Sequence, residues 1–239
     1  MAFLVIPALD LKDRKCVQLV GGDPEKKLIE EDNPIEIAKY WGESGAKRLH
    51  LIDLDGAIEG KRLNETVVIE IVEELDIPVQ FGGGLRTVED ARAFLDMGVE
   101  KIILGTMALN NPEVLEELAE KYGPERLIIA LDSKSGRVAI KGWTEDTGQR
   151  ASEIVGRFEP YVSEVLFTNI DVEGRMAGID EALVKEMIDA TSLDIIVSGG
   201  IATIADIEKV RDAGASGVVI GSALYTGKLN FKKALQLEE

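Results

Sequence analysis

Short hydrophobic runs recur along the whole chain at nearly regular spacing. Each run is rich in Leu or β-branched residues, is too short for a helix and lacks the polar alternation of a half-exposed strand. Each run therefore predicts a parallel β-strand that is buried on both faces. The eight runs span residues 3–9, 47–52, 78–81, 101–105, 126–131, 164–167, 194–198 and 217–221.

Amphipathic segments separate these runs and predict helices. Asn and Pro, or a lone Thr, precede several of these segments, as is typical of a helix N-cap and first position. The predicted helix starts lie at Asn33 with Pro34, Thr87, Asn111 with Pro112, and Thr203. Glycine favours the left-handed backbone that ends many helices, so Gly98 and Gly214 predict two helix ends.

Strand and helix therefore alternate eight times, with about 30 residues per unit, which is the size of a βα module. The sequence predicts one α/β domain over residues 1–239, a (β/α)8 TIM barrel. A doubly wound open sheet is the alternative, but its usual G-x-G-x-x-G phosphate fingerprint does not follow the first predicted strand.

An internal repeat supports the barrel. Residues 81–109 align without gaps on residues 197–225, so that Gly83 matches Gly199 and Thr87 matches Thr203. The segment ALD occurs at 8–10 and again at 130–132. We therefore expect two duplicated half-barrels, about 1–122 and 123–239, although a repeat establishes architecture rather than activity.

The repeat places an aspartate at the end of the first strand of each half, Asp10 and Asp132. The carboxyl ends of barrel strands build the active face, so both side chains should face one central cavity. Two carboxylates on either side of a substrate can act as a general base and a general acid. A single aspartate there would more simply be a solvated loop residue or a helix cap, but its repetition favours a catalytic pair.

The repeat also keeps glycines after four of the predicted strands. They occur as Gly83 with Gly84 and Gly105 with Thr106 in the first half, and as Gly199 with Gly200 and Gly221 with Ser222 in the second. Glycine lets backbone N–H groups approach an anion and a hydroxyl adds a donor, although tight turns are the commoner reason for loop glycines. Two such sites on opposite sides of the barrel predict an elongated ligand with a phosphate at each end.

Other polar residues near strand ends carry weaker signals. Thr168 could position a substrate hydroxyl or a catalytic carboxylate, or simply be a satisfied strand-end residue. Trp143, in the loop 138–148 that follows the Asp132 strand, could close over a planar ring or pack on the barrel rim. The lone His50 lies within a strand, so we expect a core or hydrogen-bonded role, and without a His or Cys cluster we expect no metal site. Further polar residues at strand ends are Asp53, Asn169 and Asp171.

Composition narrows the class of protein. With 45% hydrophobic and 30% charged residues, the chain has the composition of a folded protein and not of a disordered one. Its net charge of −17 predicts repulsion from nucleic acid and from anionic membranes, so we expect neither as a partner. No basic segment or cleavage signal precedes the first hydrophobic run and Cys16 has no second cysteine to pair with, so we expect a cytoplasmic protein.

Several segments together resemble the histidine-biosynthesis isomerases that act on phosphoribosylformimino-aminoimidazole carboxamide ribotide. The resemblance covers nearly the whole chain and rests on residues 6–19, 50–64, 79–86, 103–113, 130–143, 198–207 and 218–228. It implies a TIM barrel that needs no cofactor and catalyses an Amadori rearrangement, which turns the aminoaldose on one ribose of a bis-phosphorylated ribonucleotide into an aminoketose.

The resemblance also implies roles for single residues. Asp10 would be the base that takes the C2 proton and Asp132 the acid that assists ring opening, whereas Thr168 would position the opened sugar. Trp143 would lie near the imidazole carboxamide, and the glycine pairs would hold the two phosphates. Gln18 stands where many bacterial members have Arg, and Glu173 stands where Asp is usual; both variants resemble the archaeal branch.

The sequence is also compatible with three other functions. The cyclase subunit of imidazole glycerol phosphate synthase shares the paired aspartates, but its PCLDV-like opening reads PALDL here. Dual specificity that includes phosphoribosylanthranilate would differ only in the loops. A non-catalytic sugar-phosphate-binding barrel would have no need to keep both aspartates. No appended helix or long apolar surface run is visible, so we expect a monomer.

Overall fold

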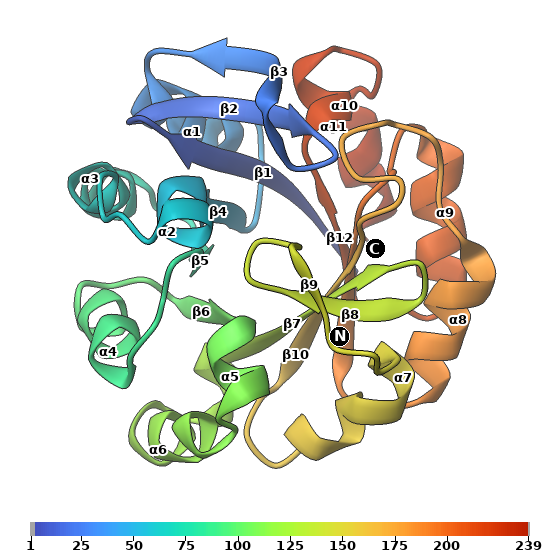
Figure 1. The fold of residues 1–239 in the computed structure, drawn as a ribbon. Helices are drawn as coiled ribbons and strands as arrows, with labels where there is room; N and C mark the ends of the chain where they lie inside the picture. The colour runs from blue at the N-terminus through green and yellow to red at the C-terminus, as the bar shows by residue number, and fades with distance from the viewer. Residues whose placement is uncertain (1–2, 239) are drawn as a thin grey trace.

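The structure, a computed structural model, describes residues 3–238 and is built around a closed ring of eight parallel strands (Figure 1). The ring closes because β12 pairs with β1, where Ile6 faces Val219, and because β7 pairs with β10. Its strands are β1 (Leu4–Lys12), β4 (Leu49–Asp53), β5 (Val79–Gly82), β6 (Lys101–Leu104), β7 (Leu127–Lys134), β10 (Glu164–Asn169), β11 (Asp194–Ser198) and β12 (Gly217–Ile220). The predicted (β/α)8 barrel and its eight strands are confirmed, and the open sheet is not formed.

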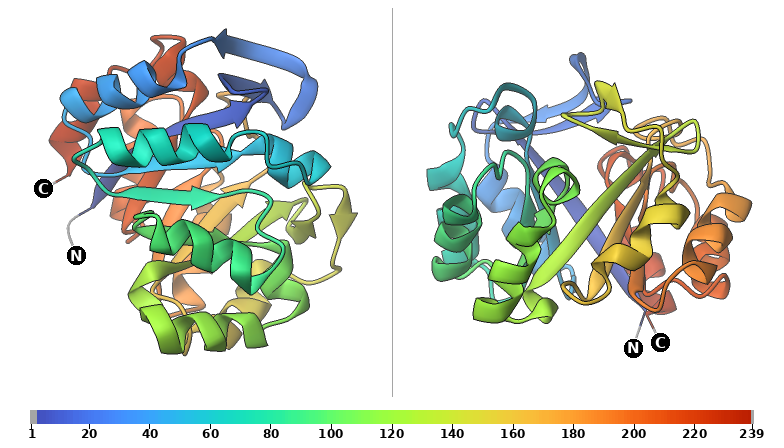
Figure 2. Two further views of the ribbon diagram at one scale, coloured as in Figure 1. Left: turned by 90° about the vertical axis from the view of Figure 1, so that its left-hand side faces the viewer. Right: turned by 60° about the horizontal axis from the view of Figure 1, so that its bottom comes forward.

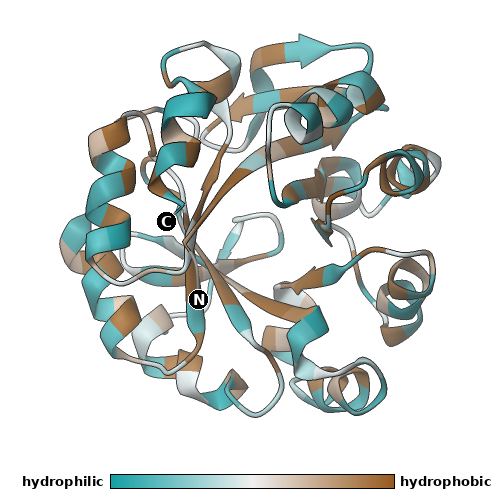
Figure 3. Cartoon of the chain, turned by 180° about the vertical axis from the view of Figure 1, so that it is seen from behind, coloured by the Kyte–Doolittle hydropathy of each residue, from teal (hydrophilic) through white to brown (hydrophobic). Residues whose placement is uncertain are grey.

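Helices surround the ring (Figure 1). Hydrophilic and hydrophobic positions alternate along them (Figure 3), and their buried hydrophobic residues pack in the same core as those of the strands. The larger helices are α1 (Pro34–Glu43), α3 (Glu65–Glu74), α4 (Val88–Asp96), α6 (Glu113–Tyr122), α8 (Glu181–Asp189) and α9 (Ile204–Asp212). The shorter ones are α2 (Leu54–Glu59), α5 (Thr106–Asn110), α7 (Ala151–Ile154), α10 (Ser222–Tyr225) and α11 (Phe231–Ala234), with 3-10 turns at Pro124–Arg126, Val155–Phe158 and Leu235–Leu237. None of the described helices is long and apolar enough to cross a membrane.

The helix ends match the sequence signals, with one correction. Thr87 and Thr203 each accept a hydrogen bond from the N–H of the aspartate three residues later and complete a capping box. Gly98 and Gly214 adopt positive φ just beyond their helices, as predicted. The predicted start at Asn111 is wrong, because Pro112 occupies the N-cap of α6 and Asn111 instead follows the last residue of the short helix α5.

Two antiparallel hairpins extend the barrel at its carboxyl end, and the sequence patterns did not predict them. β2 (Lys15–Val20) and β3 (Asp23–Glu31) follow β1, whereas β8 (Arg137–Ile140) and β9 (Glu145–Asp146) follow β7. Figure 2 shows both hairpins at one end of the barrel and the two ends of the chain together at the other. β1 and β7 therefore continue past the barrel into hairpins that stand over its mouth.

Two hydrophobic layers hold the barrel together. The outer layer lies between strands and helices, and the smaller inner layer fills the barrel with Ile6, Ala8, Ile103, Ile128, Leu166, Ile196 and Val219. The Val5 N–H donates to Glu238 at 2.8 Å, so the last described residue fastens the C-terminus to the amino end of the first strand. The inner layer closes the barrel below the mouth, so the large cavity lies at the carboxyl ends of the strands.

Candidate active site

A cavity of about 1030 Å³ opens at the carboxyl ends of the barrel strands. All twelve predicted site residues line it: Asp10, Gly83, Gly84, Gly105, Thr106, Asp132, Trp143, Thr168, Gly199, Gly200, Gly221 and Ser222. The site is thus built from both halves of the sequence repeat. Three residues that the sequence analysis did not place in the site, Gln18, His50 and Glu173, also line the cavity.

Asp10 and Asp132 hold matching positions on β1 and β7. Asp10 pairs in register with Ile52 of β4, and Asp132 pairs with Thr168 of β10. Neither aspartate ends its strand as predicted, because β1 runs on to Lys12 and β7 to Lys134. Each carboxyl group therefore lies at the base of a hairpin, partly shielded from solvent by the hairpin above it.

The two carboxyl groups have different surroundings. Burial, and secondarily the negative charge of Glu173, raise the pKa of Asp10 to about 7. Burial also raises the pKa of Asp132, but hydrogen bonds from the Trp143 indole and the Thr168 hydroxyl oppose that shift. The indole Nε1 donates to Asp132 Oδ2 at 2.7 Å. The pair can therefore hold different protonation states, as an acid and a base that act on one substrate must.

Glu173 is a third acidic group in the cavity. Burial, and then the charge of Asp132, raise its pKa to about 7, and its own charge in turn raises the pKa of Asp10. Glu173 therefore couples electrostatically to both aspartates. The family resemblance singles out Glu173 only because Asp is usual at this position. Its place in the loop after β10, where barrel loops build the active face, could have indicated that it lines the cavity.

Glycine is required in the turns that follow β5 and β11. Gly83 has a φ of 100°, and a Cβ at this position would lie 2.3 Å from the carbonyl oxygen of Asp53. Gly199 has a φ of 93°, and its Cβ would lie 2.5 Å from the carbonyl oxygen of Asn169. The two turns are close copies of one another, so the sequence repeat is also a repeat of backbone geometry.

The glycines after β6 and β12 form a second matched pair. Gly105 has φ and ψ of −112° and −102°, and Gly221 has −103° and −103°, so the two glycines share nearly the same backbone conformation. Each glycine is the N-cap of a short helix, whose first N–H groups lack intrahelical partners. Backbone donors therefore gather at two places along the cavity wall, one in each half.

The two hydroxyls beside these glycines are used differently. Thr106 Oγ1 accepts from the Lys141 N–H at 2.9 Å, which leaves its own proton free to donate. Ser222 Oγ already donates to Gln18 Oε1 at 3.2 Å. Gln18 is buried on β2, and its Nε2 has no partner among the described residues. In the second half the spare side-chain donor is thus the Gln18 amide rather than the predicted serine hydroxyl.

Trp143 lies in the turn between β8 and β9, with a φ of 68°. A Cβ on Gly22, in the turn between β2 and β3, would lie 2.4 Å from the indole ring, so the ring packs closely against that turn. Trp143 thus joins the two hairpins over the mouth while its N–H reaches Asp132. The indole ring of Trp143 therefore packs on the barrel rim, which was one of its two predicted positions, and it also lines the cavity.

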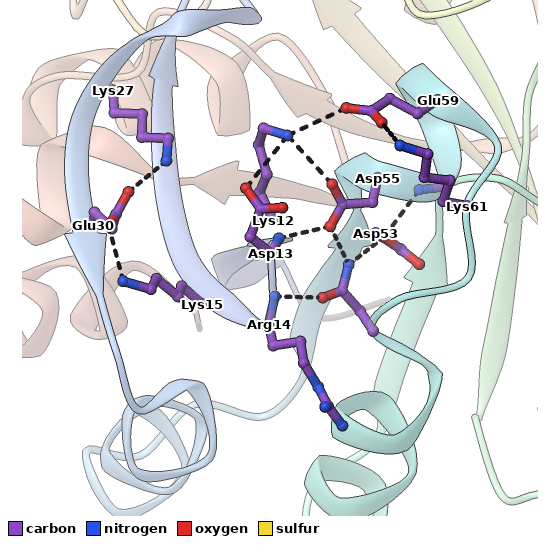
Figure 4. Close-up of polar contacts among 12 residues, drawn as sticks. Lys12, Asp13, Arg14, Lys15, Lys27, Glu30, Asp53, Asp55, Glu59 and Lys61 are labelled. Atoms are coloured by element: carbon purple, nitrogen blue, oxygen red, sulfur yellow. Dashed lines mark hydrogen bonds and ion pairs between the residues drawn. The ribbon is translucent and has the colours of Figure 1, made fainter.

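Asp53 and Asp171 lie outside the cavity and anchor the turns around it. Asn64 donates from one amide nitrogen to Asp53 at 2.6 Å and to Asp55 at 2.8 Å. Figure 4 labels these two acceptors, Asp53 and Asp55. Asp55 accepts from the Asp13 N–H in the β1–β2 turn, and Asp171 accepts in the same way from the Ser135 N–H in the β7–β8 turn. Both aspartate-anchored turns hold the hairpins above Asp10 and Asp132.

The predicted hydrogen-bonded role of His50 is confirmed. The Gln80 amide contacts its Nδ1 at 2.8 Å, and burial lowers the pKa of the imidazole to about 3. Within residues 3–238 no group of three or more His, Cys, Asp or Glu side chains could hold a metal ion. The carboxyl groups that line the cavity are suited to moving protons, and the backbone N–H groups of its glycines are suited to binding an anion.

Comparisons with known proteins assign the family. Residues 4–230 match the family described as histidine biosynthesis protein. The chain is 47% identical to a protein of Methanococcus maripaludis (strain C6) over 234 residues, 98% of each chain. It is also 47% identical to one of Methanothrix thermoacetophila over 238 residues, 99% of this chain and 98% of the relative. Both relatives are named 1-(5-phosphoribosyl)-5-((5-phosphoribosylamino)methylideneamino) imidazole-4-carboxamide isomerase. The chain belongs to the histidine biosynthesis protein family.

Proposed function

We propose that this protein is the isomerase of histidine biosynthesis that converts the bis-phosphorylated aminoaldose into the corresponding aminoketose by an Amadori rearrangement. The observation that carries the proposal is the pair Asp10 and Asp132, on matching strands of one barrel, in a cavity with glycine-lined sites contributed by both halves. The names of relatives that match the chain over nearly its full length support the same reaction.

In the proposed reaction the two aspartates move protons in opposite directions. Asp132 donates a proton as the ribose ring opens, and Asp10 takes the proton from C2 of the resulting Schiff base. Burial supports the acid role because it favours the protonated form of Asp132, and a pKa of about 7 suits Asp10 to act as a base near neutral pH. The substrate carbon skeleton is oxidised at one carbon and reduced at its neighbour, so no redox cofactor is needed.

Thr168 and Trp143 act beside the pair. Thr168 is aligned with Asp132 across β7 and β10 and positions the opened sugar, whereas the Trp143 indole covers the imidazole carboxamide. The donation from Trp143 Nε1 to Asp132 supports this arrangement because it ties the covering ring to the acid. The bound substrate thus packs against Trp143, whose indole N–H also lowers the pKa of Asp132.

The glycine sites bind the two terminal phosphates. Gly83, Gly84, Gly105 and Thr106 hold one of them, and Gly199, Gly200, Gly221 and Ser222 hold the other. In the second site the spare side-chain donor is the Gln18 amide, because the Ser222 hydroxyl donates to Gln18 Oε1. Backbone N–H groups can bind an anion in a protein whose net charge is −17 because they act at short range. The exposed Arg86, which lines the cavity, adds local positive charge.

We further propose that the barrel is one domain of two duplicated halves, 1–122 and 123–239, and that it acts as a monomer. The matching Asp13–Asp55 and Ser135–Asp171 contacts support the duplication. The most exposed large hydrophobic side chains, Leu28, Tyr40, Ile58 and Leu63, come from four separate segments of the described chain and do not require a partner. Sedimentation equilibrium at several concentrations tests the monomer.

The test follows conversion of the purified aminoaldose with a glutaminase–cyclase synthase as the coupling enzyme. We expect Asp10→Asn and Asp132→Asn to keep substrate binding and to lose between about a hundredfold and ten-thousandfold in kcat. Asp76→Asn, at an exposed position remote from the cavity, is the charge-matched control and should keep full activity. A wild-type protein that ignores the aminoaldose but consumes the aminoketose with ammonia would be the cyclase instead.

A further inference from the structure

A chain of polar side chains crosses the interior of the barrel below the proposed catalytic pair. Arg48 donates to Glu164 from its two terminal guanidinium nitrogens, Nη1 at 2.7 Å and Nη2 at 3.2 Å. Arg48 Nη1 also donates to Gln80 Oε1 at 3.2 Å, and Gln80 Nε2 contacts His50 Nδ1 at 2.8 Å. This chain of side chains begins at the Arg48–Glu164 ion pair and ends at His50, whose side chain lines the cavity.

The order of donors and acceptors along this chain has only one solution. Arginine has donors and no acceptor, so the Gln80 oxygen must face Arg48. The Gln80 NH2 group must then face His50, and a ring nitrogen that faces a donor has to accept. His50 Nδ1 therefore carries no proton. A neutral imidazole keeps its one proton on the other ring nitrogen, Nε2.

We propose that the Glu164–Arg48–Gln80 chain fixes His50 as the neutral Nε2–H tautomer and that this N–H donates a hydrogen bond to an oxygen of the reacting sugar. The second part rests on the proposed isomerase function. His50 is the group that touches substrate, whereas Gln80, Arg48 and Glu164 are positioning residues. A fixed donor of this kind needs no change of protonation during turnover.

The placement of His50 supports a contact with the sugar rather than with a phosphate. His50 pairs in register with Ala8, two residues before Asp10 on the same strand, and it precedes Ile52, the register partner of Asp10, by two residues. Its side chain thus lies one layer below the Asp10 carboxyl group on the cavity wall. The glycine-lined sites, in contrast, lie in the loops beyond the ends of the strands.

The other half of the barrel shows that the fold does not require this polar chain. At the same offset of 116 residues that relates Arg48 to Glu164, His50 corresponds to Leu166 and Gln80 to Ile196. Leu166 and Ile196 face one another in register, as His50 and Gln80 do, and both belong to the inner hydrophobic core. Burying polar groups costs free energy unless each is paired, so a polar pair where an apolar pair fills the same space points to a function.

His50 is the only histidine in the chain, which makes the tautomer directly measurable. The intact protein, labelled with 15N-histidine, gives one imidazole in a long-range 1H–15N correlation spectrum. We expect the pattern of an Nε2–H tautomer, unchanged from about pH 5 to about pH 8. An Nδ1–H tautomer, a mixture of the two, or protonation of the ring within this range would overturn the proposal.

Gln80→Glu tests the origin of the tautomer. A carboxylate in place of the amide can only accept, so we expect a proton to appear on Nδ1 of His50. Gln236→Glu makes the same chemical change at an exposed position remote from the cavity and should leave the spectrum unchanged. An unchanged spectrum in folded Gln80→Glu would contradict the relay. If this variant does not fold, the wild-type spectrum still decides between the tautomers.

Two substitutions of His50 test the substrate contact. The glutamine amide nitrogen can occupy the place of Nε2, so His50→Gln should retain most of kcat/KM, whereas His50→Phe should lose about tenfold. Equal loss in both variants, with both folded, would overturn the donor role. The spectrum is recorded without substrate, so a tautomer result stands even if the wild type fails to isomerise the aminoaldose. That failure would count against the proposed function alone.

Discussion

Arg48 and Glu164 stand 116 residues apart and form an ion pair inside the barrel, with Nη1 and Oε2 separated by 2.7 Å. Arg48 directly precedes β4 and Glu164 begins β10, so the two residues hold equivalent places in the two halves. Lys101 joins them through a 2.9 Å contact to Glu164, and burial, followed by the charge of Glu164, raises the pKa of the neighbouring Asp194. The barrel floor is therefore polar, unlike the hydrophobic layer above it.

Loss of the arginine should destabilise the protein strongly. Arg48→Met leaves Glu164 buried with one cation fewer and leaves the Gln80 oxygen without its donor, so we expect the free energy of unfolding to fall by about 3 kcal/mol. Urea unfolding followed by circular dichroism measures the change. Arg92→Met, which breaks a more exposed pair with Glu117, should cost less than about 1 kcal/mol. Equal losses in the two variants would contradict a structural role for the buried pair.

This ion pair is a feature that the sequence alone could not predict. The eight strands were predictable because each is a continuous apolar run, and the repeat placed Asp10, Asp132 and all the glycine sites in one cavity. The pairing of Arg48 with Glu164 was not predictable, because no local pattern connects residues that meet only when the barrel closes.

The hairpins were missed for a different reason. The β2–β3 hairpin includes the strongly charged segment DPEKKLIEE, whose residues are mostly exposed, so it carries no strand periodicity. Gln18 and Glu173 were noticed only as departures from a family pattern. Their roles depend on what surrounds them. The Gln18 amide nitrogen has no partner within residues 3–238, and Glu173 couples electrostatically to two aspartates.

The coupling of Glu173 to Asp10 makes the pH dependence of catalysis testable. Asp10 is the proposed base and must be deprotonated to act, so we expect kcat/KM to rise as the pH increases through about 7, the pKa of Asp10. Glu173→Gln removes a negative charge that raises this pKa, so the rise should move to lower pH. Initial rates across a pH series measure the shift, with Glu100→Gln, exposed at the other end of the barrel, as the control. A rise at the same pH in wild type and Glu173→Gln would argue against the coupling.

The same carboxyl group should affect stability with a definite sign. A folded pKa of about 7, against an ordinary value of 3.8, means that the native state binds the extra proton between these values, so stability falls as the pH rises from about 4 to about 7. Asp10→Asn removes this penalty. We expect it to raise the free energy of unfolding by about 2 kcal/mol at pH 8 and by little at pH 4. A gain that is independent of pH would contradict this account.

The indole N–H of Trp143 can be removed without the ring. Trp143→Phe keeps an aromatic ring against Gly22 but loses the 2.7 Å hydrogen bond to Asp132. In the wild type this hydrogen bond lowers the pKa of the Asp132 carboxyl group. The pKa of Asp132 should therefore rise, and the fall of activity at high pH, where a general acid is lost, should move to higher pH. We also expect kcat to drop about tenfold. A lower kcat with the alkaline limb unmoved would assign Trp143 to packing alone.

Gly83 should tolerate no side chain. Gly83→Ala places a methyl group 2.3 Å from the Asp53 carbonyl oxygen at a φ of 100°, so both a steric clash and backbone strain oppose folding. We expect a loss of more than about 3 kcal/mol in urea unfolding. Gly227 also has positive φ, at 69°, but open space around its Cβ position, so Gly227→Ala should cost only about 1 kcal/mol. Similar losses would mean that strain, and not the close approach to Asp53, makes glycine necessary.

Asn64 should contribute strongly to stability because its amide nitrogen bridges the buried carboxylates of Asp53 and Asp55. Donors from the Asp13 N–H, Asn64 and Lys12 outweigh burial and lower the pKa of Asp55, so that its contribution to stability is present above about pH 4 and is lost as the pH falls through the lowered pKa. Asn64→Ala removes one donor from Asp53 and one from Asp55. We expect it to cost about 3 kcal/mol at pH 8 and less at pH 4, because the uncompensated carboxylates can then protonate. Asn111→Ala, at an exposed position, should change stability by less than about 0.5 kcal/mol at either pH. A loss that is equal at the two pH values would assign the cost to lost packing instead of to unpaired charge.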